Sequence, residues 1–138
     1  MIKNNDAVPV LHAHIFKNIG YISFISSIYA ISNGKYQLVL SPGCVGYTSI
    51  KYWSRNDYSY WRYIDIVTVQ LGLYNNIYLA QESDNIALFL IITGLGMLSF
   101  ILAQIYIAKY PESFIPCILH SNVHILGNIS VLILIDTV

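Results

Sequence analysis

Residues 114–135 read FIPCILHSNVHILGNISVLILI, a run of 22 residues without Asp, Glu, Lys or Arg. A bilayer core of about 30 Å is crossed by about 20 helical residues, so this run is long enough to span a membrane. Two histidines, His120 and His124, lie four residues apart and therefore on one helix face. At that depth their ring nitrogens need partners, because water is not available to solvate them. The same spacing also suits two ligands of one metal ion.

The polar side chains of this run form a single stripe. Cys117, His120, His124 and Asn128 stand at positions i, i+3, i+7 and i+11. Residues with this period share one face of a helix. The stripe is therefore expected to face other helices and not lipid.

The composition of the whole chain is that of a membrane protein. Of its 138 residues, 56% are hydrophobic and 10% are charged, and the mean hydropathy is +0.57. Soluble domains have about 25% charged residues. The net charge is zero and the chain has no basic tract, so nothing predicts binding to nucleic acid. Cys44 and Cys117 lie in apolar runs, where a thiol behaves as a small hydrophobe.

The chain divides into further apolar stretches, which predict an all-α fold: a polytopic transmembrane helix bundle of about five spans. Residues 1–138 form one membrane domain in this interpretation. The predicted spans are 11–31, 36–53, 62–80, 86–108 and 114–135. A signal peptide is the alternative for the first, although Ile28 spoils the small-residue cleavage pattern. Pro42, Gly43 and Gly46 predict a kink in the second.

The basic residues predict the orientation of these spans. Five spans place the amino-terminal tail, the second-to-third loop and the fourth-to-fifth loop on one side of the membrane. That side carries six of the seven basic residues, and Lys35 alone is on the other. The six are Lys3, Lys17, Lys51, Arg55, Arg62 and Lys109. By the positive-inside rule the amino terminus is cytoplasmic, and tyrosines and tryptophans around residues 52–63 form an aromatic belt at that interface.

Four polar residues are expected at similar depth near this interface. Ser49 ends the second span, Asp65 begins the third, and His120 and His124 begin the fifth. Buried Asp and His side chains that converge from different helices offset one another's desolvation, directly or through a metal. Two alternatives remain open: an ion pair of Asp65 with Arg62, and a bond from Ser49 to a carbonyl of its own helix.

This set of residues resembles the CREST superfamily of membrane hydrolases and receptors, which includes alkaline ceramidases, adiponectin and progestin receptors and myomaker-like proteins. The family pattern is a Ser followed four residues later by His, an Asp early on the next helix, and His-x-x-x-His on the last helix. Ser49, Asp65, His120 and His124 match this pattern. Trp53 stands at the position of the first histidine. The match runs from about residue 47 to residue 128.

The resemblance implies zinc as a cofactor, with His120 and His124 as metal ligands and Ser49 and Asp65 as catalytic residues that position its water. His12 and His14, which start the first span on the cytoplasmic side, are candidates for the missing third ligand, and an interfacial tail is the alternative for them. Bound zinc lowers the pKa of water toward neutrality, and a carboxylate can take its proton for attack on a carbonyl. A site at leaflet depth favours a lipid amide or ester as substrate.

Two other functions are compatible with the sequence. In the first, the chain is a non-catalytic, receptor-like or structural membrane protein with a degenerate site, whose polar residues lock helices together. In the second, the polar stripe of the last helix lines an ion or proton pathway. All three hypotheses place the chain in a lipid bilayer as a multi-pass protein.

Overall fold

The computed structural model describes residues 7–110 and 112–138, and every regular element in that part of the chain is helical. The predicted all-α class is therefore confirmed. The elements are α1 (Val10–Gly20), α2 (Ile22–Ser32), the short 3-10 helix η1 (Tyr36–Leu38), α3 (Leu40–Arg55), α4 (Tyr60–Ala80), α5 (Ile86–Lys109) and α6 (Ile115–Thr137).

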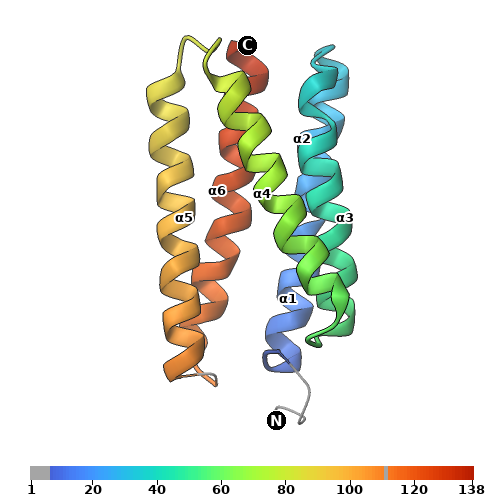
Figure 1. Cartoon of the computed structure of the whole chain (residues 1–138), viewed down its shortest axis with the longest axis vertical. Coiled ribbons are helices and arrows are strands. Elements are labelled where there is room, and N and C mark those ends of the chain that lie inside the picture. The colour runs from blue at the N-terminus through green and yellow to red at the C-terminus, as the bar shows by residue number, and fades with distance from the viewer. Residues whose placement is uncertain (1–6, 111) are drawn as a thin grey trace.

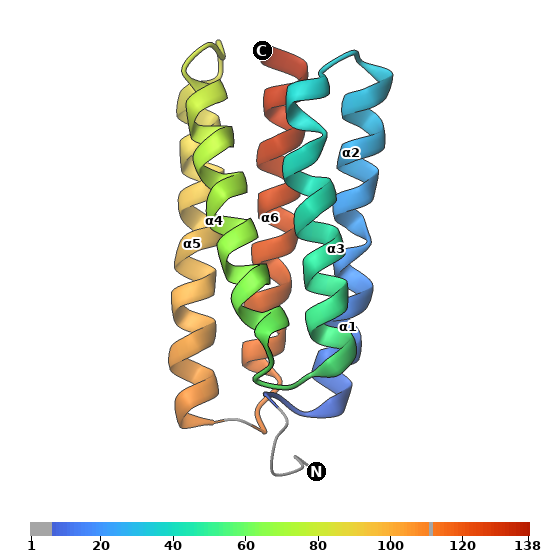
Figure 2. The same cartoon turned by 45° about the vertical axis from the view of Figure 1, so that its right-hand side comes forward.

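These helices run up and down one bundle. Figures 1 and 2 show α2 continuing the course of α1, and then α3, α4, α5 and α6 alternating in direction. We call the end that holds the start of α1, the loop 56–59 and residues 112–114 the near end. The far end holds the loops 33–35 and 81–85 and the carboxyl terminus. Helix α6 is central, because it contacts α1, α2, α4 and α5.

The first predicted span is one course of chain made of two helices. Tyr21 separates α1 from α2, but its backbone dihedrals, φ −66° and ψ −23°, are helical. Its amide N–H donates to the Asn18 carbonyl three residues back, at 3.2 Å, and not to the residue four back. Such 3-10 hydrogen bonds tighten a helix without ending its course. The break therefore leaves α1 and α2 in line.

The second predicted span begins later than expected and holds its proline where no helical hydrogen bond is lost. Helix α3 starts at Leu40, so Pro42 lies in its first turn. The amide groups of a first turn have no partner within the helix, and a proline there breaks nothing. Pro42, Gly43 and Gly46 therefore lie within one continuous helix, α3. The interruption of this predicted span is at Val39, between η1 and α3.

Asn56 ends α3 and holds the segment before α1. Its φ of 50° is in the left-handed region, which asparagine tolerates at helix ends. Its side-chain amide donates to the Val8 carbonyl at 2.8 Å, and its Oδ1 accepts from the Val8 N–H at 3.3 Å. The Ala7 N–H donates to the Asn56 carbonyl. Asn56 therefore fixes the start of the first helix to the end of the third.

The interior has apolar clusters at both ends and polar residues between them. The far-end cluster is formed by Ala30, Leu38, Ala80, Phe89, Val131, Leu134 and Ile135. The near-end cluster is formed by Val8, Ala13, Phe16, Tyr52, Trp53 and Cys117. Buried between them are Ser23, Ser26, Thr48, Ser49, Asp65, His124 and Asn128. The middle of the bundle is therefore built from small and polar side chains.

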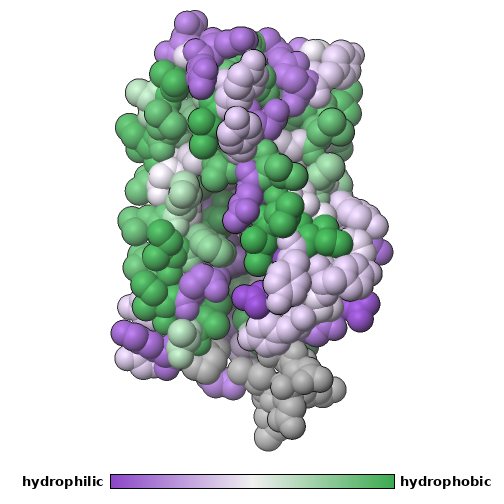
Figure 3. Space-filling view, viewed as in Figure 1, coloured by the Kyte–Doolittle hydropathy of each residue, from purple (hydrophilic) through white to green (hydrophobic). Residues whose placement is uncertain are grey.

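The outer surface, in contrast, is mostly apolar. Figure 3 shows hydrophobic residues over much of the middle of one face, with hydrophilic residues gathered toward its two ends. In the part of the chain that the structure describes, two helices, α5 and α6, are long and apolar enough to cross a membrane. Their bounds lie within two residues of the predicted spans 86–108 and 114–135.

Candidate functional site

The Asp65 carboxylate joins α4 to α3. Its Oδ1 atom accepts a hydrogen bond from the Ser49 hydroxyl at 2.7 Å and another from the Thr48 hydroxyl at 2.8 Å. All three side chains are buried, Ser49 completely. Because the loop 56–59 is short and the helices are antiparallel, the second turn of α4 lies beside the last turns of α3. The structure thus brings together Ser49 and Asp65, and adds Thr48, which the sequence analysis missed.

Neither alternative partner is used among the described residues. Arg62 places its guanidinium over the Tyr58 ring, with Cζ 5.0 Å from the ring centroid. The ion pair found in this part of the chain joins Arg55 to Asp57 instead, at 3.4 Å. Hydrogen bonding from Ser59 lowers the pKa of Asp57 and so favours the ionised form of this loop carboxylate. Asp65 is therefore held by hydroxyl groups and not by a cation.

His120 and His124 lie one above the other on α6. Their ring centroids are 5.2 Å apart, in an edge-to-face arrangement. The predicted stripe faces inward: Cys117, His124 and Asn128 are buried and His120 is partly buried. The helix thus presents both rings to the interior of the bundle.

Aromatic rings surround His120. The Phe16 ring lies 4.4 Å from it and the Trp53 ring 5.3 Å, centroid to centroid. Phe16 is itself 4.5 Å from Trp53, so one ring each from α1, α3 and α6 meet in a three-way contact. Phe100 of α5 approaches from another side at 6.5 Å. His120 is therefore packed as part of an aromatic cluster.

Trp53 lies next to His120, where the CREST pattern would place its first histidine. The side chain is buried, and its indole Nε1 has no hydrogen-bond partner. An indole nitrogen is only a donor and has no lone pair to give to a metal. Trp53 therefore lies beside His120, as the family's first histidine would, but it cannot act as a metal ligand.

The described residues do not supply a third metal ligand to the histidine pair. Among the described residues, no group of three His, Cys, Asp or Glu side chains is placed to hold one ion. His12 is buried with its ring edge-to-face against Phe114, at 5.6 Å. His14 is exposed on α1. Zinc sites with catalytic roles use three protein ligands, so the set present does not fit the family's site.

Asn128 connects α6 to α2, a link that the sequence analysis did not identify. Its Oδ1 accepts from the Ser26 hydroxyl at 2.6 Å, and its Nδ2 donates to the Ser23 hydroxyl at 3.2 Å. Nδ2 also donates to the His124 carbonyl at 2.7 Å. The available signal was the i, i+3 spacing of Ser23 and Ser26 within an apolar run, which matches one helix face.

Comparison with known proteins adds no relative. No protein family matches this chain, and no curated protein or solved structure is similar enough to it to be matched. The resemblance to the CREST superfamily accordingly depends on Ser49, Asp65, His120 and His124 themselves, together with the place of Trp53.

Proposed function

We propose that this chain is a structural, non-catalytic membrane protein of five spans, in which the CREST-like positions fasten helices to one another. The observation that carries the proposal is the distribution of side chains: thirteen polar or charged residues are buried among the described residues, and many large apolar ones are exposed. A soluble protein buries its apolar residues. In lipid, by contrast, small and polar residues lie between helices and apolar residues face outward.

Helices α2 and α5 illustrate this distribution. In α2 the buried residues are three serines and one alanine, whereas Ile25, Ile28 and Ile31 are 50–65% exposed. In α5 the buried residues are Phe89, Gly96 and Ala103. Eleven large apolar side chains of α5 are exposed. Such surfaces require an apolar solvent, and a bilayer supplies it.

The lengths of the remaining elements agree with five crossings. Helices α1 and α2 with Tyr21 rise about 34 Å in line, and α4, with 21 residues, rises about 32 Å. Both match a hydrocarbon core of about 30 Å. Helix α3 alone rises about 24 Å, and η1 precedes it at the far end. The basic residues support a cytoplasmic near end. Those in the near-end parts of the helices are Lys17 of α1, Lys51 and Arg55 of α3, Arg62 of α4 and Lys109 of α5.

The polar contacts supply the structural role. Asp65 with Ser49 and Thr48 links α4 to α3, and Asn128 with Ser23 and Ser26 links α6 to α2. At the far end, Tyr29 donates to Asp136 at 3.0 Å and the Ser83 and Thr137 hydroxyls share a hydrogen bond. Hydrogen bonds of this kind are the attractive contacts available between helices that lipid surrounds.

Replacement of Asp65 separates a structural role from a catalytic one. Asp65→Asn keeps a carbonyl oxygen with two lone pairs, which can accept both hydroxyls. We expect its melting temperature in detergent to stay within a few degrees of the native value. Asp65→Leu removes both hydrogen bonds and should lower the stability by about 1–2 kcal/mol. Thermal unfolding monitored by circular dichroism measures both.

The same variants are assayed for hydrolysis of fluorogenic lipid amides and esters. We expect the native chain and Asp65→Asn to give equal background rates. Fatty-acid release by the native chain that Asp65→Asn abolishes without loss of stability would contradict the proposal, and would favour the hydrolase.

A second function, zinc binding at a CREST-like site, is favoured by the adjacent His120 and His124 rings and by the place of Trp53 beside His120. If the site is degenerate only at that neighbour, Trp53→His should restore a third imidazole and bind zinc stoichiometrically. We expect no stoichiometric zinc in the purified native chain and none in Trp53→His combined with His124→Ala. The zinc content per chain is measured by plasma mass spectrometry. One zinc per native chain would establish this second function instead of the structural one.

A further inference from the structure

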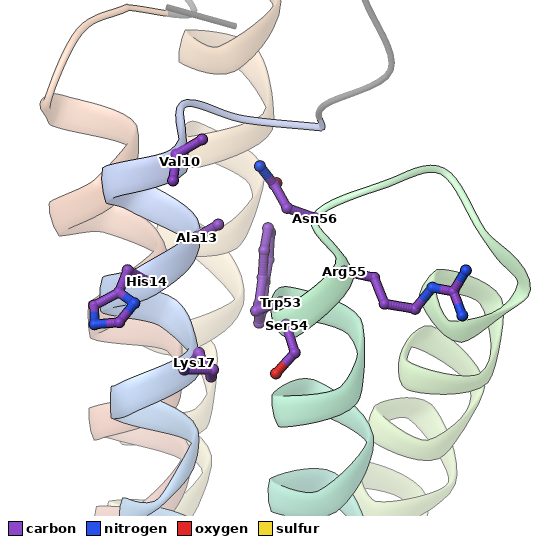
Figure 4. A pocket seen from close by; sticks show the side chains of 8 residues that line it. All are labelled: Val10, Ala13, His14, Lys17, Trp53, Ser54, Arg55 and Asn56. Atoms are coloured by element: carbon purple, nitrogen blue, oxygen red, sulfur yellow. The ribbon is translucent and has the colours of Figure 1, made fainter. Parts of the chain in front are cut away.

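A pocket opens at the near end, between the first turns of α1 and the last turn of α3. Its volume is about 240 Å³, several times the roughly 30 Å³ that one water occupies in the liquid. Figure 4 shows α1 side chains on one side of the gap and the end of α3 on the other. The lining residues are Val10, Ala13, His14, Lys17, Trp53, Ser54, Arg55 and Asn56.

The lining is cationic and rich in donors. Lys17 and Arg55 carry positive charge, the Ser54 hydroxyl is a donor, and none of the eight described lining residues is acidic. In Figure 4 the Arg55 side chain points away from α1 and from the gap. Its Nε contacts the Asp57 carboxylate at 3.4 Å. Exposed ion pairs of this kind are weak, so the guanidinium is free to exchange Asp57 for another anion.

The walls of the pocket are fixed by neighbouring contacts. Trp53 packs against Phe16 and Tyr52, at 4.5 and 4.2 Å between ring centroids. Asn56 is held by Val8 through two hydrogen bonds. A pocket with preset walls loses little entropy when a ligand binds. The Trp53 and Asn56 walls are therefore in place before a ligand binds, and Arg55 is the lining residue that has to move.

The pocket lies at the depth of the lipid headgroups if the five-span proposal holds, and the inference rests on that proposal. Exposed tyrosines of the near end, Tyr58, Tyr60 and Tyr63, are typical of a membrane–water interface. The cytoplasmic leaflet, which the positive-inside rule assigns to this end, is the one that carries anionic lipids.

We propose that this pocket binds the phosphate of an anionic phospholipid headgroup. Lys17 and Ser54 contact the phosphate oxygens from opposite sides, and Arg55 turns in from the rim. Trp53 forms the wall beside the glycerol. Lys17, Ser54 and Arg55 take no part in the hydrogen bonds that link α3 to α4 and α2 to α6.

The test is a titration of the detergent-purified full chain with short-chain phosphatidylglycerol in uncharged micelles. A Trp61→Phe background leaves Trp53 as the single tryptophan, so its fluorescence reports on the pocket wall. We expect saturable binding that Lys17→Ala weakens about fivefold, the equivalent of the ~1 kcal/mol that one basic residue contributes near an anionic lipid. Combined with Arg55→Ala the loss should be larger.

Lys51→Ala is the matched control, because Lys51 is exposed at the same end, lies over Tyr47 and does not line the pocket. Its affinity should stay within about twofold of the native value. Equal losses for Lys17→Ala and Lys51→Ala would show a diffuse surface attraction and overturn the site.

Two further arms identify the source of the phosphate. Inorganic phosphate that binds as tightly as the lipid would overturn the headgroup assignment in favour of a free anion. Phosphatidylcholine that binds as tightly as phosphatidylglycerol would overturn the preference for net negative charge. Resistance of the chain to alkaline extraction from membranes is measured separately, so a chain that is embedded but shows no headgroup binding contradicts this inference alone.

Discussion

Gly46→Leu is expected to separate α3 from α1 and α2 and to destabilise the bundle by about 3 kcal/mol. A Cβ atom at Gly46 would lie 3.1 Å from the Gly20 carbonyl oxygen and 3.1 Å from the Ser23 Cβ. The first of these is backbone, which cannot move aside as a flexible side chain can. Leucine adds three more carbons at this crossing. We expect the melting temperature in detergent to fall by roughly 10 °C.

Gly94→Leu is the matched control for this substitution. Gly94 is helical and exposed on α5, and a Cβ there would meet nothing within 4 Å. The same change of side chain should therefore leave the melting temperature nearly unchanged. Equal effects at Gly46 and Gly94 would contradict the close helix crossing.

Phe16→Ala is expected to have an effect of similar size, about 3 kcal/mol. The ring is 1% exposed and packs against both Trp53 and His120, which also contact each other. Its removal leaves a cavity where three helices meet, and the surrounding rings can fill it only partly. Part of the usual transfer term is absent in lipid, so the loss comes mainly from packing. Chemical denaturation in mixed micelles measures it.

Phe100→Ala controls for the loss of an aromatic ring near His120. Phe100 is 42% exposed on α5, and its ring lies farther from His120, at 6.5 Å. The loss should be well below that of Phe16→Ala. A Phe16→Ala variant as stable as Phe100→Ala would show that the cluster around His120 does not support the bundle.

The positions of the helices could be predicted from the sequence because charges and turn residues mark their ends. The predicted span 86–108 corresponds to α5, Ile86–Lys109, because it contains no charged residue and no proline. The inward face of α6 followed from the period of Cys117, His124 and Asn128. The similar depth of Ser49 and Asp65 followed from their places at the end of one span and the start of the next. Their hydrogen bond did not follow, because a carbonyl of its own helix was an equally available partner for Ser49.

Other features depend on how helices cross, which no local pattern contains. The three-way contact of Phe16, Trp53 and His120 requires that α1, α3 and α6 meet at the near end. Arg62 was a reasonable partner for Asp65 by spacing, but Tyr58 attracts its guanidinium by a cation–π contact. The break at Tyr21 adds one tight turn beside the crossing of Gly20 and Gly46, and neither glycine reveals its partner in the sequence.

The five crossings are tested most directly by the side of the membrane on which each loop lies. With Cys44 and Cys117 replaced by alanine, single cysteines are placed at four exposed sites: Asn33, Tyr58, Asp84 and Glu112. Each variant is treated in intact cells with a membrane-impermeant maleimide, before and after permeabilisation.

For the five-span bundle, we expect positions 33 and 84 to react in intact cells and positions 58 and 112 to react only after permeabilisation. If α5 and α6 alone crossed the membrane, positions 33, 58 and 84 would react alike and position 112 would differ. That result, or equal reaction at all four positions in intact cells, would contradict the five-span bundle.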